Sequence, residues 1–500
     1  MPSSRARLAI VLIALTLAAA VLRLWALPFG LPQPLARPDE EAIASAVARI
    51  VRYGPNPQFF DYPTAFFYAV ALVEKTAPDP GLDTSRAITT ARRISASCGI
   101  LCVPLLFVAA RRLCSERVAV IGAALLAVAF LHVRDSHFGV TDVPMTFMVL
   151  LAFAAIVSLP RDHPRWPPVA AAAFLCGLAA STKYNGGMIA AALVVALIVT
   201  RAPRVLYAVA GASILAGFLV GTPYAWIARE QFVAALTGVQ HHLASGHAVD
   251  EGPGWMRHAR VSLWYGVGPA CLAAAVAGSL WLIAHDRRRA AVALAFPILY
   301  FAVMGSGRTA FVRHMTPMIP FVTLLAAIAI DAAASGLTRR RSHRVAMATA
   351  VVLTAAVGYS STIRAVALNR LLSERDSRII AAEFVKNRFE PKGASVFQTG
   401  DVYGHVWLSP EGLYPELPLA KMPTLVIVQR SRLAAYSQQP AGLAEQLRAS
   451  YQLVLQVDVE RQDAVVEPVF DQQDAFFVPL DGFERMLRPG PAIEVYERAR

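Results

Sequence analysis

Residues 8–41 read LAIVLIALTLAAAVLRLWALPFGLPQPLARPDEE, and this stretch decides the fold class. Residues 8–28 form an apolar run of the length that crosses a bilayer as one helix. The acidic triplet Asp39, Glu40 and Glu41 follows it closely. Carboxylates gathered where a chain leaves the bilayer usually serve chemistry, transport or ion binding. The stretch therefore predicts a membrane protein whose first outer loop carries the function.

A secretory signal peptide is the alternative for this N-terminal segment, because Arg5 and Arg7 precede the apolar run. The run is long for a signal peptide, and no small-x-small cleavage site precedes the acidic loop. We therefore interpret residues 8–28 as a retained first span.

The whole chain has the composition of a multi-pass membrane protein. Of its 500 residues, 56% are hydrophobic, and the mean hydropathy is +0.48. The net charge of +13 comes mainly from short loops between apolar runs, which indicates membrane orientation and not nucleic-acid binding. Arginine greatly outnumbers lysine, which indicates a GC-rich genome, so we predict a bacterial plasma (inner) membrane protein. The five cysteines form no CxxC pair, which argues against a disulfide framework or a structural zinc site.

Apolar runs predict a polytopic α-helical membrane protein with about eleven transmembrane helices. They cover residues 8–28, 94–110, 118–133, 143–159, 167–182, 186–200, 205–226, 261–284, 290–305, 312–334 and 344–362. With the N-terminus in the cytoplasm, every cytoplasmic connection is basic, as the positive-inside rule requires. These connections hold Arg111, Arg112 and Arg117; Arg161 and Arg165; Arg201 and Arg204; Arg287, Arg288 and Arg289; and Arg339, Arg340, Arg341 and Arg344. The apolar segment 62–73 is too short to span, so we interpret it as an interfacial or re-entrant helix.

This topology places the unusual connections on the outer face, at residues 29–93, 134–142, 181–187, 227–260 and 305–314. From residue 370 the long apolar runs stop. Residues 373–389 have the pattern of an amphipathic helix, and residues 393–399, 423–429, 451–459 and 491–498 have that of short strands. We therefore predict a transmembrane domain over residues 1–365 and a small C-terminal extracytoplasmic α/β domain over residues 370–500.

Two acidic positions are candidates for chemistry. Asp39 and its neighbours also fit a plain helix N-terminus, because acids favour the positive end of a helix dipole and Pro38 precedes them. Asp142 also fits a helix start ahead of Pro144. However, the turn RDSHFGVTD at 134–142 gathers several ionisable groups where two spans meet, which favours a functional role.

Cations at the outer ends of the spans are the second set of candidates. Lys183 ends a span in the turn STKYNGG, where snorkelling to the interface is the plain alternative. Arg308 and Arg313 interrupt the arginine-poor pattern of the outer side. Cations kept there against the orientation bias suggest that an anion binds.

Several motifs together resemble the glycosyltransferase C (GT-C) superfamily, in particular family 39. They are the acidic pair Asp39-Glu40, FFDYP at 59–63, RDSHFGVTDVPMTF at 134–147, TKYNG at 182–186 and RHMTPMIP at 313–320. This family includes protein O-mannosyltransferases, the aminoarabinose transferase of lipid A and phospholipid-carrier-dependent relatives. The resemblance covers roughly residues 8–335. The chain differs from the protein mannosyltransferases in having no obvious β-trefoil insertion, which argues against a protein acceptor.

The resemblance implies inverting transfer of a sugar from a polyprenyl-phosphate donor to a hydroxyl of a lipid, glycan or protein. A phosphate leaves readily as an anion, so one base is the main requirement. By correspondence with the family, Asp39 is the base, and Glu40 and Asp142 orient the acceptor or the base. Three cations would hold the phosphate, namely Lys183, Arg313 and Arg134. Five further residues would bind the acceptor or line the cavity, namely Asp61, Tyr62, His137, Tyr184 and His314. No segment has metal-ligand spacing, so we predict no cofactor, with a divalent metal as the alternative.

Two other functions fit parts of the pattern. A proton-coupled or lipid-linked-sugar secondary transporter would also use membrane acids and a lysine, although transporters usually carry inverted repeats and mid-membrane polar sites. A membrane-anchored binding protein acting through the C-terminal domain would leave the acidic loop unexplained. Sugar transfer from a lipid-phosphate donor separates the enzyme from both.

Overall fold

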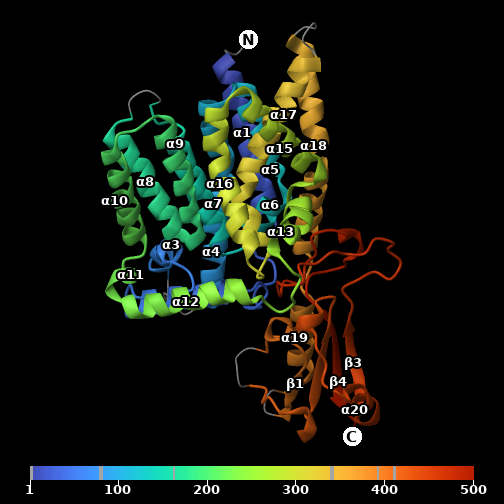
Figure 1. The fold of residues 1–500 in the computed structure, drawn as a ribbon. Helices are drawn as coiled ribbons and strands as arrows, with labels where there is room; N and C mark the ends of the chain where they lie inside the picture. The colour runs from blue at the N-terminus through green and yellow to red at the C-terminus, as the bar shows by residue number, and fades with distance from the viewer. Residues whose placement is uncertain are drawn as a thin grey trace.

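The computed structural model describes residues 4–77, 83–160, 164–337, 343–390, 393–408 and 413–499. Figure 1 shows a bundle of long helices with a small sheet domain at one end. The first described residues, from Ser4 on, lie at the opposite end of the bundle. Four of the basic positions used for the topology, Arg161, Arg339, Arg340 and Arg341, lie outside the described residues.

The bundle has a helix at each predicted span. Within the described residues, six helices are long and apolar enough to cross a membrane, or up to eight with two bent pairs. The predicted spans at 143–159, 167–182 and 186–200 form shorter apolar helices. The elements are α1 (Ser4–Leu24), α4 (Thr84–Leu113), α5 (Glu116–Val128) with α6 (Phe130–Ser136), α7 (Asp142–Ile156), α8 (Trp166–Thr182), α9 (Ala190–Val199), α10 (Arg204–Gly221), α14 (Trp264–Val267) with α15 (Pro269–His285), α16 (Arg287–Ser306), α17 (Ile319–Leu337) and α18 (His343–Ser373).

Two spans are broken in ways that the apolar pattern did not show. The first break bends α5 against α6 by 55°, and it is stabilised by Arg23 of α1. The Arg23 guanidinium donates to the carbonyl oxygens of Leu126 and Ala127 at 3.1 and 2.9 Å, so that the carbonyls freed by the bend are paired. The second break lies at Gly268, where φ is 84° and the chain bends by 108° before Pro269 starts α15.

Close packing of α8 on α10 depends on glycine. A Cβ at Gly177 would lie 2.1 Å from the carbonyl oxygen of Ile214, and one at Gly217 would lie 2.2 Å from that of Phe174. Small residues let two membrane helices approach closely. This pair holds the C-terminal end of α8, where Lys183 follows, in a fixed place beside α7.

Short helices cover the end of the bundle that carries the C-terminal domain. They are α2 (Glu40–Tyr53), α3 (Ala65–Glu74), α11 (Tyr224–Ile227), α12 (Arg229–Ser245) and α13 (Gly254–Arg257). Segment 62–73 thus forms the short helix α3, one of the helices of 10–17 residues. Figure 1 shows α12 lying across the ends of the bundle helices.

The C-terminal domain is a four-stranded sheet with a helix on each face. Its elements are α19 (Ser377–Arg388), β1 (Val396–Gln398), β2 (Leu425–Arg430), α20 (Leu443–Ser450), β3 (Tyr451–Val457) and β4 (Ala492–Arg498), with strand order β1-β2-β4-β3. β1 is parallel to β2, and the other pairs are antiparallel. Alternate residues of β2 face opposite helices, because Ile427 packs with α19 and Val428 packs with α20. The predicted helical bundle with a small C-terminal α/β domain is confirmed.

The C-terminal domain shares a hydrophobic core with the bundle. The residues after β3 return to the membrane helices, and Leu480 and Phe483 belong to the same buried cluster as Phe130 of α6. The Arg364 guanidinium of α18 also donates to Asp481 at 2.8 and 3.0 Å. α18 continues to Ser373, beyond the predicted boundary at residue 365. The two predicted domains therefore meet over a packed interface.

Candidate active site

A cavity of about 620 Å³ lies at the end of the bundle that carries the C-terminal domain. Four of the five outer segments singled out in the sequence line it, together with three parts of the C-terminal domain. The polar lining comprises Asp39, Glu41, Asp61, Tyr62, Lys183, Tyr184, Asn185, His242, His247, Thr309, Arg313, His314, Tyr403, Tyr436, Gln473 and Asp474. The fold thus brings seven of the predicted site residues to one place: Asp39, Asp61, Tyr62, Lys183, Tyr184, Arg313 and His314.

Asp39 occupies a strained position at the start of α2. Its φ of 74° is in the left-handed region, which is uncommon for a residue other than glycine. Its side chain makes no capping hydrogen bond to the helix. Instead, its Oδ2 accepts from Nη2 of Arg313 at 2.7 Å. Strained residues of this kind cluster at functional sites. The plain helix-cap alternative therefore does not account for this side chain.

Arg313 is held between two carboxylates. Its Nη1 donates to Oδ2 of Asp474 at 3.1 Å, while Asp39 accepts from Nη2. The other oxygen of Asp474 accepts from Nη1 of Arg37 at 2.9 Å. Burial alone would raise the pKa of Asp474, but Arg37, Arg313 and Arg134 outweigh it and lower the pKa to about 2. Asp474 is therefore ionised at neutral pH and fixes the direction in which Arg313 points.

Lys183 forms the second cationic point of the cavity. It follows α8 directly, and its Nζ donates to Asp142 at the start of α7 at 2.6 Å. An acid at a helix N-terminus and a cation at a helix C-terminus both complement the helix dipoles. Nζ also lies 5.7 Å from the ring centre of Tyr62. Asp142 itself does not line the cavity, so its contact with Lys183 is its link to the site.

Tyr62 and Asp61 lie on the loop between α2 and α3. Burial, and next to it the negative charge of Asp39, raise the pKa of Tyr62, which keeps its hydroxyl protonated. Burial also raises the pKa of Asp61. Tyr184 also lines the cavity and donates to the carbonyl oxygen of Phe60 at 2.7 Å. This loop is thereby joined to the end of α8.

Three residues of the lining carry buried polar atoms that lack a hydrogen-bond partner within the described part of the chain. The atoms are Nδ1 of His314, Oδ1 of Asn185 and Oε2 of Glu41. Buried polar groups are nearly always paired, so several unpaired atoms around one cavity indicate a place for a bound molecule. Oε1 of Glu41 accepts from the Tyr403 hydroxyl at 2.8 Å. Burial raises the pKa of Glu41, so its carboxylate takes up a proton more readily than usual.

The remaining predicted residues lie behind the cavity. Both oxygens of Glu40 accept from Arg92, at 2.8 and 2.6 Å, and Oε1 also accepts from the backbone N–H of Gly139. Arg134 pairs with Asp135 at 2.8 Å. Both ring nitrogens of His137 lie 2.9 Å from backbone carbonyl oxygens. Glu40 thereby joins the start of α2 to α4 and to Gly139, and His137 joins the end of α6 to Trp25, whereas Arg134 pairs with its neighbour in the chain.

The sequence interpretation missed the segment FDQQDAFF at 470–477. Asp471 accepts from the backbone N–H of Val312 at 2.9 Å, and Gln473 accepts from that of Ala310 at 2.7 Å. This segment therefore orders the turn that carries Arg313. Its two acids and paired glutamines, in a domain of otherwise alternating pattern, are the signal that could have found it.

Comparisons with known proteins identify the fold. Residues 76–226 match the family model of dolichyl-phosphate-mannose-protein mannosyltransferases. None of the curated protein sequences matches this chain. The oligosaccharyltransferase of Archaeoglobus fulgidus, tethered with an acceptor peptide, is similar in structure with a TM-score of 0.56 and 15% identity. That match covers 78% of this chain but only 58% of the archaeal one.

Two structures of ArnT from Cupriavidus metallidurans are also similar. The apo form has a TM-score of 0.54 and 14% identity, and the match covers 98% of each chain. The form bound to undecaprenyl phosphate has a TM-score of 0.50 and 17% identity, covering 76% of this chain and 72% of the other. The chain thus has the GT-C fold, as its motifs predicted.

Proposed function

We propose that this protein transfers a sugar, with inversion, from a polyprenyl-phosphate donor to a hydroxyl acceptor on the outer face of the membrane. One observation carries the proposal: a single cavity at the end of the bundle holds a carboxylate, Asp39, and two cations, Lys183 and Arg313. This is the combination that the reaction needs, since one group takes a proton and the others receive a departing phosphate.

The cations suit the leaving group. The guanidinium of Arg313 can present parallel N–H donors to phosphate oxygens, and Lys183 adds a compact charge. When the bond between the anomeric carbon and the phosphate oxygen breaks, the electron pair stays with the phosphate, whose charge these two groups stabilise. The acceptor oxygen forms the new bond to the anomeric carbon from the opposite face. Its proton passes to a base, for which Asp39 is our candidate.

An apolar groove supports a lipid-linked donor. It has a volume of about 570 Å³ and is lined by residues of α9, α15 and α16, among them Val195, Ile283 and Leu299. The groove reaches Ala302 of α16, and Met304 on the same helix lines the cavity. A prenyl tail in this groove would lie among apolar side chains, with its phosphate end toward the cavity.

The test is single-turnover transfer at saturating donor by purified, folded variants. Asp39→Asn keeps the size of the side chain but removes the basic oxygen, so the rate should fall at least about a hundredfold. Asp331→Asn is the matched control, because Asp331 also pairs with an arginine, Arg117, but does not line the cavity. Near-normal turnover by Asp39→Asn with loss of activity in Asp142→Asn would reassign the base.

The same assay separates the enzyme from the transporter alternative. An enzyme cleaves the donor and yields free polyprenyl phosphate in proportion to the glycosylated acceptor. A transporter would move the intact lipid-linked sugar or another solute with no bond cleavage. Donor that stays intact in the presence of wild-type protein and membrane acceptors would therefore overturn the proposal.

A further inference from the structure

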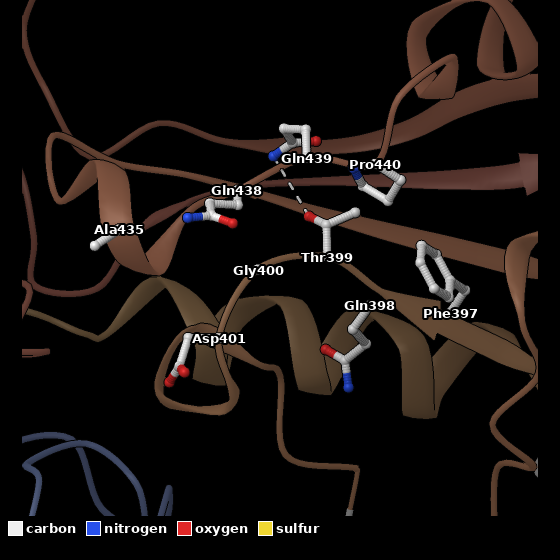
Figure 2. Close-up of a pocket in the computed structure, with 9 residues that line it drawn as sticks. All are labelled: Phe397, Gln398, Thr399, Gly400, Asp401, Ala435, Gln438, Gln439 and Pro440. Carbon is white, nitrogen blue, oxygen red and sulfur yellow. Dashed lines mark hydrogen bonds between the residues drawn. The ribbon is translucent and has the colours of Figure 1, made fainter. Parts of the chain in front are cut away.

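A second cavity lies in the C-terminal domain, outside the site described above. It has a volume of about 470 Å³ and is lined by the segments that follow β1 and β2, where these two parallel strands end. Figure 2 shows Thr399 and Asp401 on the first segment and Gln438 and Gln439 on the second, with Phe397 at one side. In α/β sheets, crevices at the carboxyl ends of parallel strands commonly bind ligands. The volume is within the range of small-molecule sites.

This cleft, defined by residues 397–401, 435 and 438–440, lies back to back with the catalytic cavity. Asp401 lines the cleft, whereas Tyr403, two residues later, lines the catalytic cavity. In the same way Ala435 lines the cleft and Tyr436 lines the catalytic cavity. The backbone N–H of Asp401 donates to the carbonyl oxygen of Tyr436 at 2.9 Å and joins the two turns. The wall between the cavities is thus only two short turns thick.

The side chains that line the cleft indicate which class of ligand it suits. Its polar side chains are three glutamine amides, one threonine hydroxyl and one carboxylate, flanked by the ring of Phe397. Amides and hydroxyls both donate and accept hydrogen bonds, which suits the neighbouring hydroxyls of a sugar. Neither lysine nor arginine is among the described residues that line the cleft, and this disfavours a phosphate group.

Two side chains of the cleft differ in their freedom. The Gln439 amide is held in place, because its Nε2 donates to the carbonyl oxygen of Gln429 at 2.7 Å and lies 3.5 Å from Oγ1 of Thr399. Gln438 is exposed and makes no side-chain hydrogen bond within the described part of the chain. The cleft therefore offers both a fixed polar wall and a free amide at its mouth.

We infer that this cleft binds a neutral glycan segment of the acceptor, so that the acceptor is an oligosaccharide chain whose reacting hydroxyl enters the adjacent catalytic cavity. The inference rests on the proposed function, because it extends the acceptor side of that reaction. A chain of several sugars is long enough to pass around two turns. The C-terminal domain then selects the acceptor, and the membrane helices hold the donor.

The test uses the full-length protein in nanodiscs and a set of soluble, neutral oligosaccharides of two to six hexoses. Binding is measured by saturation-transfer NMR. Gln438→Trp fills the mouth of the cleft at an exposed position, so the affinity for the bound oligosaccharide should fall at least about tenfold. Gln452→Trp is the matched control, because Gln452 is an exposed glutamine of β3 that does not line the cleft. This variant should bind like the wild type.

Donor cleavage is measured in parallel to keep the two proposals apart. Transfer of the sugar from its polyprenyl phosphate to water needs the catalytic cavity alone. Gln438→Trp should therefore leave the rate of this hydrolysis unchanged. Wild-type protein that cannot cleave the donor contradicts the proposed function. Cleavage of the donor without oligosaccharide binding, or equal binding by Gln438→Trp and wild type, overturns the glycan cleft alone. Binding of a peptide set in place of the sugars would overturn it as well.

Discussion

Replacing Asp474 with asparagine tests whether the C-terminal segment positions Arg313, the arginine that we propose to bind the donor phosphate. Asp474 is 2% exposed and pairs with both Arg37 and Arg313. Nε and Nη2 of Arg37 have no partner within the described part of the chain, so the substitution removes the carboxylate that pairs with this buried guanidinium. Breaking a buried pair by removing one partner costs about 3–5 kcal/mol. Because the asparagine oxygen still accepts one hydrogen bond, we expect the lower end, about 3 kcal/mol.

Hydrogen exchange measured by mass spectrometry gives the readout. A loss of about 3 kcal/mol corresponds to roughly a hundredfold faster exchange where segment 471–476 opens locally. The Michaelis constant for the donor should rise as well, since Arg313 loses one of its two carboxylates. If the contact between Asp474 and Arg313 served stability alone, the substitution would speed exchange but leave the affinity for the donor unchanged.

Asp481→Asn is the matched control for this experiment. Asp481 is also an aspartate of the C-terminal region that pairs with an arginine of the bundle, Arg364, at 2.8 Å. That pair is partly exposed and lies away from the cavity, so its loss should cost about 1 kcal/mol or less. Exchange in Asp474→Asn within threefold of wild type, with an unchanged Michaelis constant, would refute the positioning argument.

Three further predictions address the phosphate site, the acid response and the topology. Lys183→Met and Arg313→Met should each lose about 1.5–3 kcal/mol in donor binding or rate, roughly ten- to a hundredfold, whereas the exposed Arg308→Met should behave like wild type in the same titration. The pKa of Asp474 is lowered on folding, so its contribution to stability is present above about pH 4 and is lost as the pH falls toward about 2. The exchange of segment 471–476, divided by its intrinsic rate at each pH, should therefore rise over that interval in wild type and stay flatter in Asp474→Asn. A periplasm-active reporter fused at the C-terminus should be active and a cytoplasmic reporter at the same site inactive, and the reverse result would refute the assigned orientation.

Apolar runs and alternation predicted the elements of the fold well. Each run of the bundle became a helix, and each of the four short C-terminal patterns became a strand of one sheet. The breaks before Phe130 and at Gly268 were not predicted, because an apolar run has the same composition whether straight or bent. The bend before Phe130 also depends on Arg23, which is more than a hundred residues away in the sequence.

The residues of the candidate site could be predicted only where a local motif shows their chemistry. Asp39, Lys183 and Arg313 lie in distinctive turns, and they share one cavity. Glu40 has the same local setting as Asp39, yet its partner Arg92 is 52 residues away and draws it into the core. Successive residues at a helix start point in different directions, so sequence alone could not separate the two acids.

The pairing of Arg37 with Asp474 spans 437 residues of the chain. Ribosomes synthesise Asp474 only after every helix of the bundle. The growing polypeptide therefore contains Arg37 and Arg313 before it contains the carboxylate that pairs with both of them. A nascent chain that stops before Phe470 would leave the two guanidinium groups without this carboxylate. The site can therefore be assembled only when synthesis has passed the last membrane helix and the first three strands of the sheet, which makes its completion a late step in biogenesis.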